Sequence, residues 1–218
     1  MTTTEMVLSD TRETTPATHT FGDASAFELA QRMAKALAAS ELVPQQFRGE
    51  KGLPNTLIAI ELAQRTGASP LAVMQNLYIV QGKPTWSAQF IIGCLNSCGR
   101  FGPLRYSIEG QGDSLSCYAW AVDLSTNERL EGPKVTMAMA KAEGWLSKAG
   151  SKWQTMPDLM IRYRAATFFG RLYAPDLLLG MPTADEVRDI EVDQRTGEVT
   201  SVRGVLGLKR RLGGAGHE

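Results

Sequence analysis

Residues 134–176 read KVTMAMAKAEGWLSKAGSKWQTMPDLMIRYRAATFFGRLYAPD, a stretch rich in basic and aromatic residues. It carries three acidic residues, Glu143, Asp158 and Asp176, against a larger set of basic ones. The basic residues are Lys134, Lys141, Lys148, Lys152, Arg162, Arg164 and Arg171. Because the protein as a whole is formally neutral, this basic excess is a local feature.

Aromatic residues lie among these cations, namely Trp145, Trp153, Tyr163 and Tyr173. Cations spaced along a surface with aromatic rings between them suit a strand of phosphates with exposed bases. The alternative is a solvated basic face over an ordinary core. Composition alone leaves both interpretations open.

The second half of the stretch predicts a long helix. Pro157 suits the first helical position and Asp158 the first turn, and Pro175 ends the helix after about Tyr173. At roughly 100° per residue, one apolar stripe should face the core. Its members are Ile161, Ala165, Phe168 and Leu172.

The arginines of this helix divide between its two flanks. Arg164 and Arg171 are seven residues apart and lie nearly on one line, whereas Arg162 projects roughly 160° away from Arg164. Tyr163 points outward between the flanks. Arginines on opposite flanks cannot contact the same short piece of a nucleic-acid backbone equally. The alternative role for Arg162 is a structural salt bridge.

The bulk properties predict a soluble globular chain. With 218 residues, 43% hydrophobic and 21% charged, it can form one good core or two small ones. No apolar run is long enough to cross a bilayer, and the polar N-terminus lacks the apolar region of a secretory signal. Three cysteines, an odd number, favour reduced thiols and a cytoplasmic location.

The domain prediction is a single core between two tails. Residues 1–24 are rich in Thr, Ser and Glu and predict a disordered tail. Residues 25–190 form the core, and residues 191–218 read as a mobile C-terminal tail with a small basic cluster.

The first half of the core predicts helices around one hairpin. Residues 25–43 show helical spacing with Ser25 as N-cap, followed by a loop over 44–52. A second helix should begin near Pro54 and end at Gly67, and a third should begin at Ser69-Pro70. Residues 77–86 predict a hairpin with Lys83 near its tip, after which Ser87 caps a helix that stops at Gly99.

In the second half of the core, the sequence pattern at first repeats every two residues, as it does in β-strands. Residues 103–110, 114–124 and 128–137 predict three strands of an antiparallel meander. A helix over 137–145, a loop over 146–152, the long helix and a short acidic helix over 183–191 follow. The predicted class is therefore α+β, with a small antiparallel sheet and hairpins packed with helices.

The sequence lacks the residues that several kinds of catalytic, metal or nucleotide-binding site require. Both histidines, His19 and His217, fall in the predicted tails, which leaves no core His for a Ser/His or Cys/His nucleophile. Without a core His to complete a zinc site, the cysteines are predicted to be buried thiols. They are Cys94, Cys98 and Cys117. Gly82-Lys83 is followed by Pro84, so it is not a P-loop and gives no reason to expect ATP use.

Two competing functions are kept as alternatives. Asp123, Glu131 and Lys134 resemble a nuclease carboxylate–lysine cluster, which would bind a divalent metal. The charges are also ordinary for strands and turns. The other alternative is a regulator that binds one duplex sequence.

Four segments together resemble the RecT/Redβ superfamily of phage single-strand annealing proteins. They read GKPTWSAQFIIGCLNSCGRFGPLRY (82–106), KAEGW (141–145), GSKWQTMPDLMIRYRAATFFGRLYAPDL (150–177) and TADEVRDI (183–190). The most specific part is Trp153, Pro157, Met160, Arg162 and Arg164, followed by the acidic segment. The likeness covers roughly residues 25–190.

The resemblance implies an ATP-independent recombinase that coats single-stranded DNA and anneals complementary strands. It implies a basic groove that grips the backbone, and assembly of the protein as a ring or helical filament. The implied partners are single-stranded DNA, the annealed duplex intermediate, further copies of the chain, a phage exonuclease and a host single-stranded DNA-binding protein, in the host cytoplasm if the chain is phage-encoded. No cofactor and no membrane are expected, with Mg²⁺ at most assisting.

The positions that match the basic residues of the family are Lys152, Arg162 and Arg164, followed by Lys141, Lys148 and Arg171. The complete set of candidate DNA contacts is Lys152, Arg162, Arg164, Arg171, Lys141, Lys148, Lys134, Trp153, Tyr163, Lys83 and Arg105. Annealing makes no bonds, so no catalytic residue is assigned.

Overall fold

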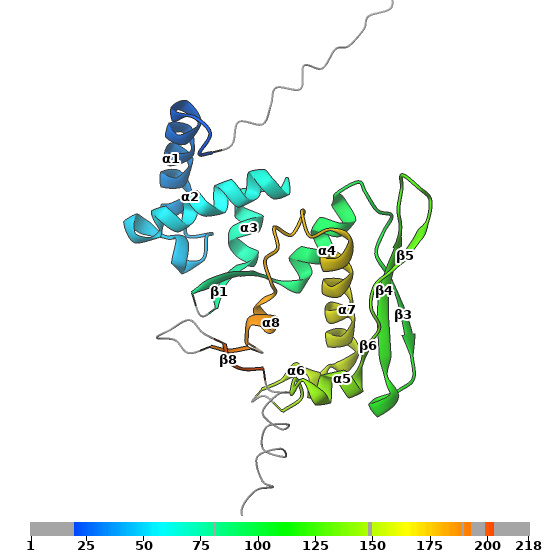
Figure 1. The fold of residues 1–218 in the computed structure, drawn as a ribbon. Helices are drawn as coiled ribbons and strands as arrows, with labels where there is room; N and C mark the ends of the chain where they lie inside the picture. Colours follow the sequence, from blue (N-terminus) through cyan, green and yellow to red (C-terminus); the bar gives the residue numbers. More distant parts are fainter. Residues whose placement is uncertain (1–19, 81, 148–149, 189, 193–198, 203–218) are drawn as a thin grey trace, which may run out of the picture.

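The computed structural model describes residues 20–80, 82–147, 150–188, 190–192 and 199–202. Two helices form the N-terminal part, α1 (Ala24–Ala38) and α2 (Gly49–Thr66), with a short 3-10 turn, η1 (Gln45–Phe47), between them. They pack through Ala30, Ala34 and Ile60, which are all buried. Figure 1 shows this pair at one end of the molecule, away from the sheet.

The start of α1 differs from the prediction. The N-cap is Asp23 rather than Ser25: its Oδ1 accepts a hydrogen bond from the backbone N–H of Ala26 at 2.8 Å. The Ser25 hydroxyl donates to the same oxygen at 2.6 Å. The predicted tail also ends earlier, because the backbone N–H of buried Thr20 donates to Glu61 on α2 at 3.1 Å. Residues 1–19 lie outside the described residues.

Helix α2 begins five residues before the predicted start, at Gly49, so that Pro54 lies inside it. Gly52 explains the early start, because an added Cβ there would lie 2.2 Å from the backbone carbon of Phe47. Only glycine permits this close return of the chain. The helix ends as predicted at Gly67, which adopts the left-handed conformation at φ 68°.

The predicted hairpin and its flanking helices are confirmed. Helix α3 (Pro70–Asn76) is capped by Ser69, and α4 (Ala88–Ser97) by Ser87. Between them β1 (Leu77–Val80) pairs with β2 (Lys83–Trp86) in an antiparallel register that sets Leu77 opposite Trp86.

The predicted meander is also present. Strands β3 (Arg105–Glu109), β4 (Ser116–Val122) and β5 (Arg129–Glu131) lie in that order, and β6 (Val135–Thr136) pairs with the start of β4. The short turn η2 (Gly112–Ser114) joins β3 to β4. Alternate residues of β4 face opposite sides: Cys117, Ala119 and Ala121 are fully buried, whereas the residues between them are half-buried.

Helix α7 (Pro157–Tyr173) is the centre of the core. Figure 1 shows it between the sheet and α4, so it buries two sides. Its start and end agree with the prediction, but the stripe does not: Leu172 is 56% exposed, while Phe169 is fully buried. Contact with the sheet and with α4 together buries Ile161, Ala165, Ala166, Phe169 and Gly170, a wider band than one stripe.

Shorter elements complete the fold. Helices α5 (Met137–Ala142) and α6 (Lys152–Thr155) lead into α7. The predicted acidic helix is α8 (Ala184–Arg188). Beyond it β7 (Ile190–Val192) pairs with β8 (Val199–Val202), within the segment predicted to be a tail. The other residues of that tail lie outside the described ones.

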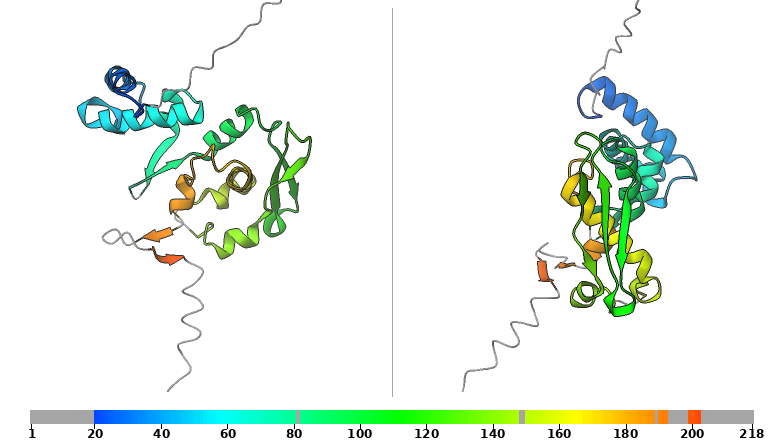
Figure 2. Two further views of the ribbon diagram at one scale, coloured as in Figure 1. Left: turned by 45° about the horizontal axis from the view of Figure 1, so that its top comes forward. Right: turned by 90° about the vertical axis from the view of Figure 1, so that its right-hand side faces the viewer.

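The class is therefore α+β, as predicted, with small antiparallel sheets and helices. The two turned views in Figure 2 show that helices lie against one face of the β3–β6 sheet. Among the described helices, none combines the length and apolar character that a bilayer-spanning segment requires.

Candidate nucleic-acid interface

A pocket of about 480 Å³ lies where the hairpin and the start of α4 meet α6, α7 and α8. Residues from distant parts of the sequence line it: Tyr78, Trp86, Ser87, Ala88, Gln89, Trp145, Gly150, Ser151, Lys152, Trp153, Leu159, Met160, Tyr163, Arg164, Ala184 and Asp185. The walls are largely aromatic or apolar, with polar groups among them. This composition is typical of a binding site.

Trp86 fixes one wall of the pocket. Its backbone N–H donates to the carbonyl of Pro182 at 3.0 Å, and its indole Nε1–H donates to the carbonyl of Leu178 at 3.2 Å. Ser87, the next residue, donates its hydroxyl to Asn76 at 2.7 Å while capping α4. The hairpin is thereby joined to the segment that follows α7.

Four of the candidate DNA contacts line this pocket: Lys152, Trp153, Tyr163 and Arg164. Lys152 is exposed at the start of α6, and the Tyr163 hydroxyl accepts a hydrogen bond from Gln89 at 3.2 Å. Trp153 is only 4% exposed and packs against Trp145 with ring centroids 5.1 Å apart. It lines the pocket as a buried wall residue, whereas the prediction had it as a DNA contact.

Arg164 occupies the floor of the pocket in a buried charge cluster. Its guanidinium carbon lies 4.1 Å from the centroid of the Trp145 ring, and its Nη1 lies 3.6 Å from Glu186 Oε1. The side chains of both ionic partners are 8% exposed. Burial lowers the pKa of Arg164, and the carboxylate of Glu186 acts in the opposite direction. Arginine nevertheless stays charged in proteins.

Glu186 holds two arginines at once. Its Oε2 accepts hydrogen bonds from Arg171 Nη2 and from the backbone N–H of Thr183, both at 2.8 Å. Its Oε1 is buried without a hydrogen bond and faces Arg164. Arg164 and Arg171, both candidate DNA contacts, therefore join α7 to α8. The structural ion pair considered for Arg162 belongs to Arg164 instead.

Arg162 lies on the opposite flank of α7, in agreement with the angular argument. Its Nη1 donates to the carbonyl of Asp158 at 2.8 Å. It also lies close enough to the sheet to oppose the effect of burial on Cys117 and Tyr106, whose pKa values burial raises to about 11 and about 12. Arg162 is not among the residues that line the pocket.

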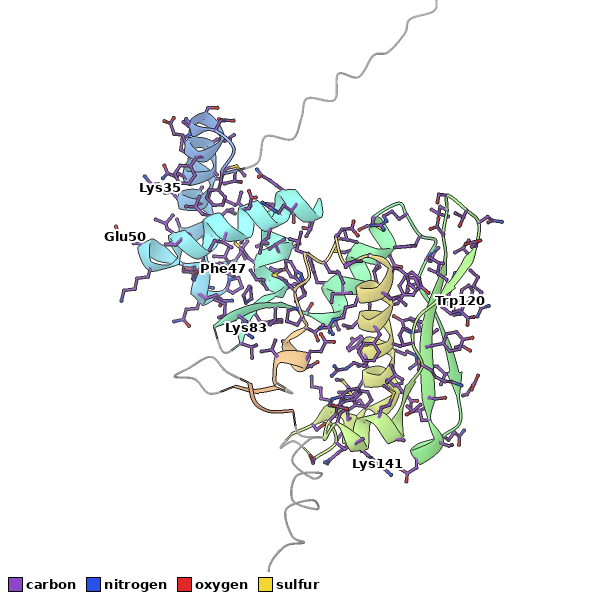
Figure 3. The ribbon with its side chains drawn as sticks, in the orientation of Figure 1. Lys35, Phe47, Glu50, Lys83, Trp120 and Lys141 are labelled. Carbon is purple, nitrogen blue, oxygen red and sulfur yellow. The ribbon has the colours of Figure 1, made fainter. Side chains whose placement is uncertain are left out.

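The remaining candidates lie elsewhere. Lys134 pairs with Glu109 and Lys141 with Asp113, each at 2.6 Å, and Arg105 is exposed on β3. Lys83 is exposed at the start of β2, and Figure 3 places it on the hairpin. Lys148 falls outside the described residues. The structure thus brings together only part of the predicted set.

The carboxylates of the nuclease alternative are not brought together. Asp123 follows the end of β4 and accepts hydrogen bonds from the hydroxyl and the backbone N–H of Ser125, which lower its pKa. Lys134 precedes β6, which pairs with the opposite end of β4, about 20 Å away along the strand. Glu131 pairs with Arg129 at 2.9 Å. Within the described residues, no three His, Cys, Asp or Glu side chains converge as a metal site.

The prediction of buried thiols agrees with the structure. Cys94 and Cys117 are buried and Cys98 is half-buried, and all three are free. Burial raises the pKa of Cys94, like that of Cys117, to about 11, so these thiols stay protonated at neutral pH.

Tyr78, Gln89 and Asp185 are among the pocket residues that sequence reasoning missed. Tyr78 is 43% exposed, but its neighbour Ile79 is exposed as well, so no alternation along β1 marks Tyr78 as the residue that faces the pocket. Nothing local marks Gln89, because its position depends on how α4 packs against α7.

Comparison with family models, with curated proteins and with solved structures finds no match to this chain.

Proposed function

We propose that the protein binds single-stranded DNA and anneals complementary strands without nucleoside triphosphate hydrolysis. The observation that carries this proposal is the meeting of the hairpin with α6 and α7 around one pocket. Exposed Tyr78 and exposed Lys152 border it, and Tyr163 and Gln89 provide polar groups.

The two cations of the pocket, Lys152 and Arg164, have different surroundings and are assigned different roles. Arg164 already faces carboxylates, with Glu186 and Asp185 both acting on it. Lys152 is exposed, and no ion pair is found for it among the described residues. We therefore assign the phosphate contact at this pocket to Lys152, and to Arg164 the role of shaping the floor.

Base contact at this site is expected to be light. Trp145 and Trp153 are buried and Tyr163 is half-buried, so the most exposed ring of the pocket is that of Tyr78. Stacking on one aromatic ring contributes about 1–3 kcal/mol per base. A strand held mainly through its phosphates keeps the other base edges free for pairing, which annealing requires.

Assembly is part of the proposal, because one pocket spans few nucleotides. Neighbouring protomers on the same strand gain affinity through effective concentration. The proposed contact between protomers is made by exposed apolar residues on the N-terminal helices and in the connection between them; they are Leu29, Met33, Leu42 and Ile58. A head-to-tail contact that does not close gives a helical filament, and one that closes gives a ring.

The test compares Lys152→Ala with Lys51→Ala, which changes an exposed lysine on α2 outside the pocket. Lys152→Ala should weaken binding of a labelled 40-nucleotide single strand and flatten its log–log salt dependence by about 0.7, the value for one phosphate contact. Lys51→Ala should leave both unchanged. Fluorescence anisotropy at several salt concentrations measures them.

Annealing of two complementary oligonucleotides should proceed in the absence of ATP and slow down with Lys152→Ala. A strict ATP requirement, or unchanged binding by Lys152→Ala, would overturn the proposal. Degradation of the labelled strand on addition of Mg²⁺ would favour the nuclease alternative.

A further inference from the structure

The outer face of the β3–β6 sheet carries aromatic and basic side chains that the pocket does not use. Tyr118 and Trp120 alternate with the buried residues of β4 and therefore point away from α7. The register places Arg105 and Glu131 opposite Trp120, on the same face. Figure 3 shows Trp120 on the side of the sheet away from α7, and no described helix covers that side in Figure 2.

Arg129 forms a layer over the aromatic residues of this face. Its guanidinium carbon lies 4.0 Å from the centroid of the Trp120 ring, and its Nη2 donates to the Tyr118 hydroxyl at 3.2 Å. An ion pair with Glu131 at 2.9 Å holds it from the other side. The side chain is still 47% exposed, so the planar group presents its outer surface to solvent.

The charges of this face are positive in sum. Arg105, Arg129 and Lys134 stand against Glu109 and Glu131, which leaves an excess of one positive charge. Both acids are already paired, Glu131 with Arg129 and Glu109 with Lys134. For Arg105, which is exposed, no ion pair is found among the residues that the structure describes.

We infer that this outer face is a second binding surface for single-stranded nucleic acid, separate from the pocket. A base stacks on the exposed plane of Arg129, which Trp120 supports from beneath, and Arg105 contacts a phosphate. Guanidinium planes and aromatic rings on open sheets are platforms on which unpaired bases stack. Tyr118 and Trp120 are about 7 Å apart along β4, close to twice the 3.4 Å rise of a duplex strand and so suited to a stretched single strand.

A second copy of the chain is a poorer occupant of this face. Interfaces between copies favour apolar contact. None of the large exposed apolar residues in the described part of the chain belongs to β3, β4, β5 or β6, and five of them lie on or beside the N-terminal helices: Phe21, Leu29, Met33, Leu42 and Ile58. On the sheet face the aromatic rings are half-buried and Arg129 covers Trp120.

Two binding surfaces on one protomer would serve annealing directly. The pocket and the outer face lie on opposite sides of α7 and the sheet, so one protomer can hold two segments together. This raises the effective concentration of the second strand. The inference shares its ligand with the proposed function but depends on different residues.

Three variants test this surface in the full chain. Arg105→Glu should weaken binding of the labelled single strand about tenfold and flatten its salt dependence by about 0.7 or more. Arg129→Lys keeps the charge but removes the planar group, so binding should weaken about fivefold with the slope unchanged. Lys51→Glu, the matched charge reversal on α2, should bind as the unaltered protein does.

The outcomes separate this inference from the proposed function. If Lys152→Ala weakens binding while Arg105→Glu and Arg129→Lys do not, the second surface is refuted and the pocket stands. The reverse result refutes the pocket and supports the sheet face. If the unaltered protein binds no single strand, both are overturned; and if Arg105→Glu changes only the oligomeric state in sedimentation, the face is a contact between copies and this inference is overturned.

Discussion

Arg164 shows how a single residue can match a functional pattern and have a structural role. Sequence reasoning counted it among the DNA contacts because of its place in a basic, aromatic stretch. In the structure it is buried between Trp145 and Glu186. Helical geometry predicted which flank of α7 it occupies, but Glu186 lies 22 residues further along the chain and no local signal links the two.

Replacing Arg164 by Ala should therefore destabilise the fold. Removing one partner of a buried ion pair leaves the other uncompensated, at a cost of about 3–5 kcal/mol. We expect about 3 kcal/mol, because Arg171 still contacts Glu186. Urea unfolding followed by circular dichroism measures the change.

Arg162→Ala is the matched control on the same helix. Arg162 is partly exposed, and the hydrogen bond found for it among the described residues goes to a backbone carbonyl of its own helix, so we expect a loss below about 1 kcal/mol. Equal stability of Arg164→Ala and Arg162→Ala would show that the buried cluster does not hold α8 to α7.

At the scale of elements, the fold depends on the close approach of the sheet to α7. Gly132 follows β5, and a Cβ added there would lie 3.2 Å from both the carbonyl oxygen of Ala119 and the Cα of Phe169. These are backbone neighbours on β4 and α7, which cannot move independently. The position therefore requires glycine for space.

Gly132→Ala should lower the free energy of unfolding by about 1–3 kcal/mol, the usual effect of overpacking a core. For Gly93→Ala we expect the free energy of unfolding to rise instead. Gly93 is an exposed position inside α4, with nothing within 4 Å of an added Cβ. Alanine should stabilise that helix by about 0.5–1 kcal/mol. Thermal unfolding of the two variants should shift in opposite directions, and a shift in the same direction would contradict this description of the interface.

The elements themselves were largely predictable, because their signals are local. Ser69, Ser87 and Gly67 mark helix ends through their own backbone or hydroxyl groups, and the structure has these ends where expected. The early start of α2 depends on Gly52 fitting against Phe47. The burial of Phe169 instead of Leu172 depends on two packing partners. Sequence periodicity predicts a single buried stripe, which corresponds to one packing partner.

The whole molecule presents three different surfaces: the pocket, the outer face of the sheet and the apolar N-terminal helices. The third has a depression of about 340 Å³ beside Leu29 and Met33, at the junction of α1 with α2. We expect it to receive an apolar side chain of a neighbouring protomer during assembly on DNA.

Leu29→Glu should therefore reduce assembly on a long single strand, while affinity for a short oligonucleotide remains. The control is Leu124→Glu, which alters a similarly exposed leucine (60% against 52%) after β4. Sedimentation velocity with and without a 100-nucleotide strand distinguishes them. Assembly by Leu29→Glu at the level of the unaltered protein would place the contact between protomers elsewhere.

The two hydrogen bonds of Trp86 set an order of events during synthesis on the ribosome. Their acceptors, the carbonyls of Leu178 and Pro182, leave the exit tunnel more than ninety residues after Trp86 itself. Until then the nascent hairpin lacks the wall that closes the pocket. The proposed binding of a strand there therefore has to wait until the chain has been translated past Pro182.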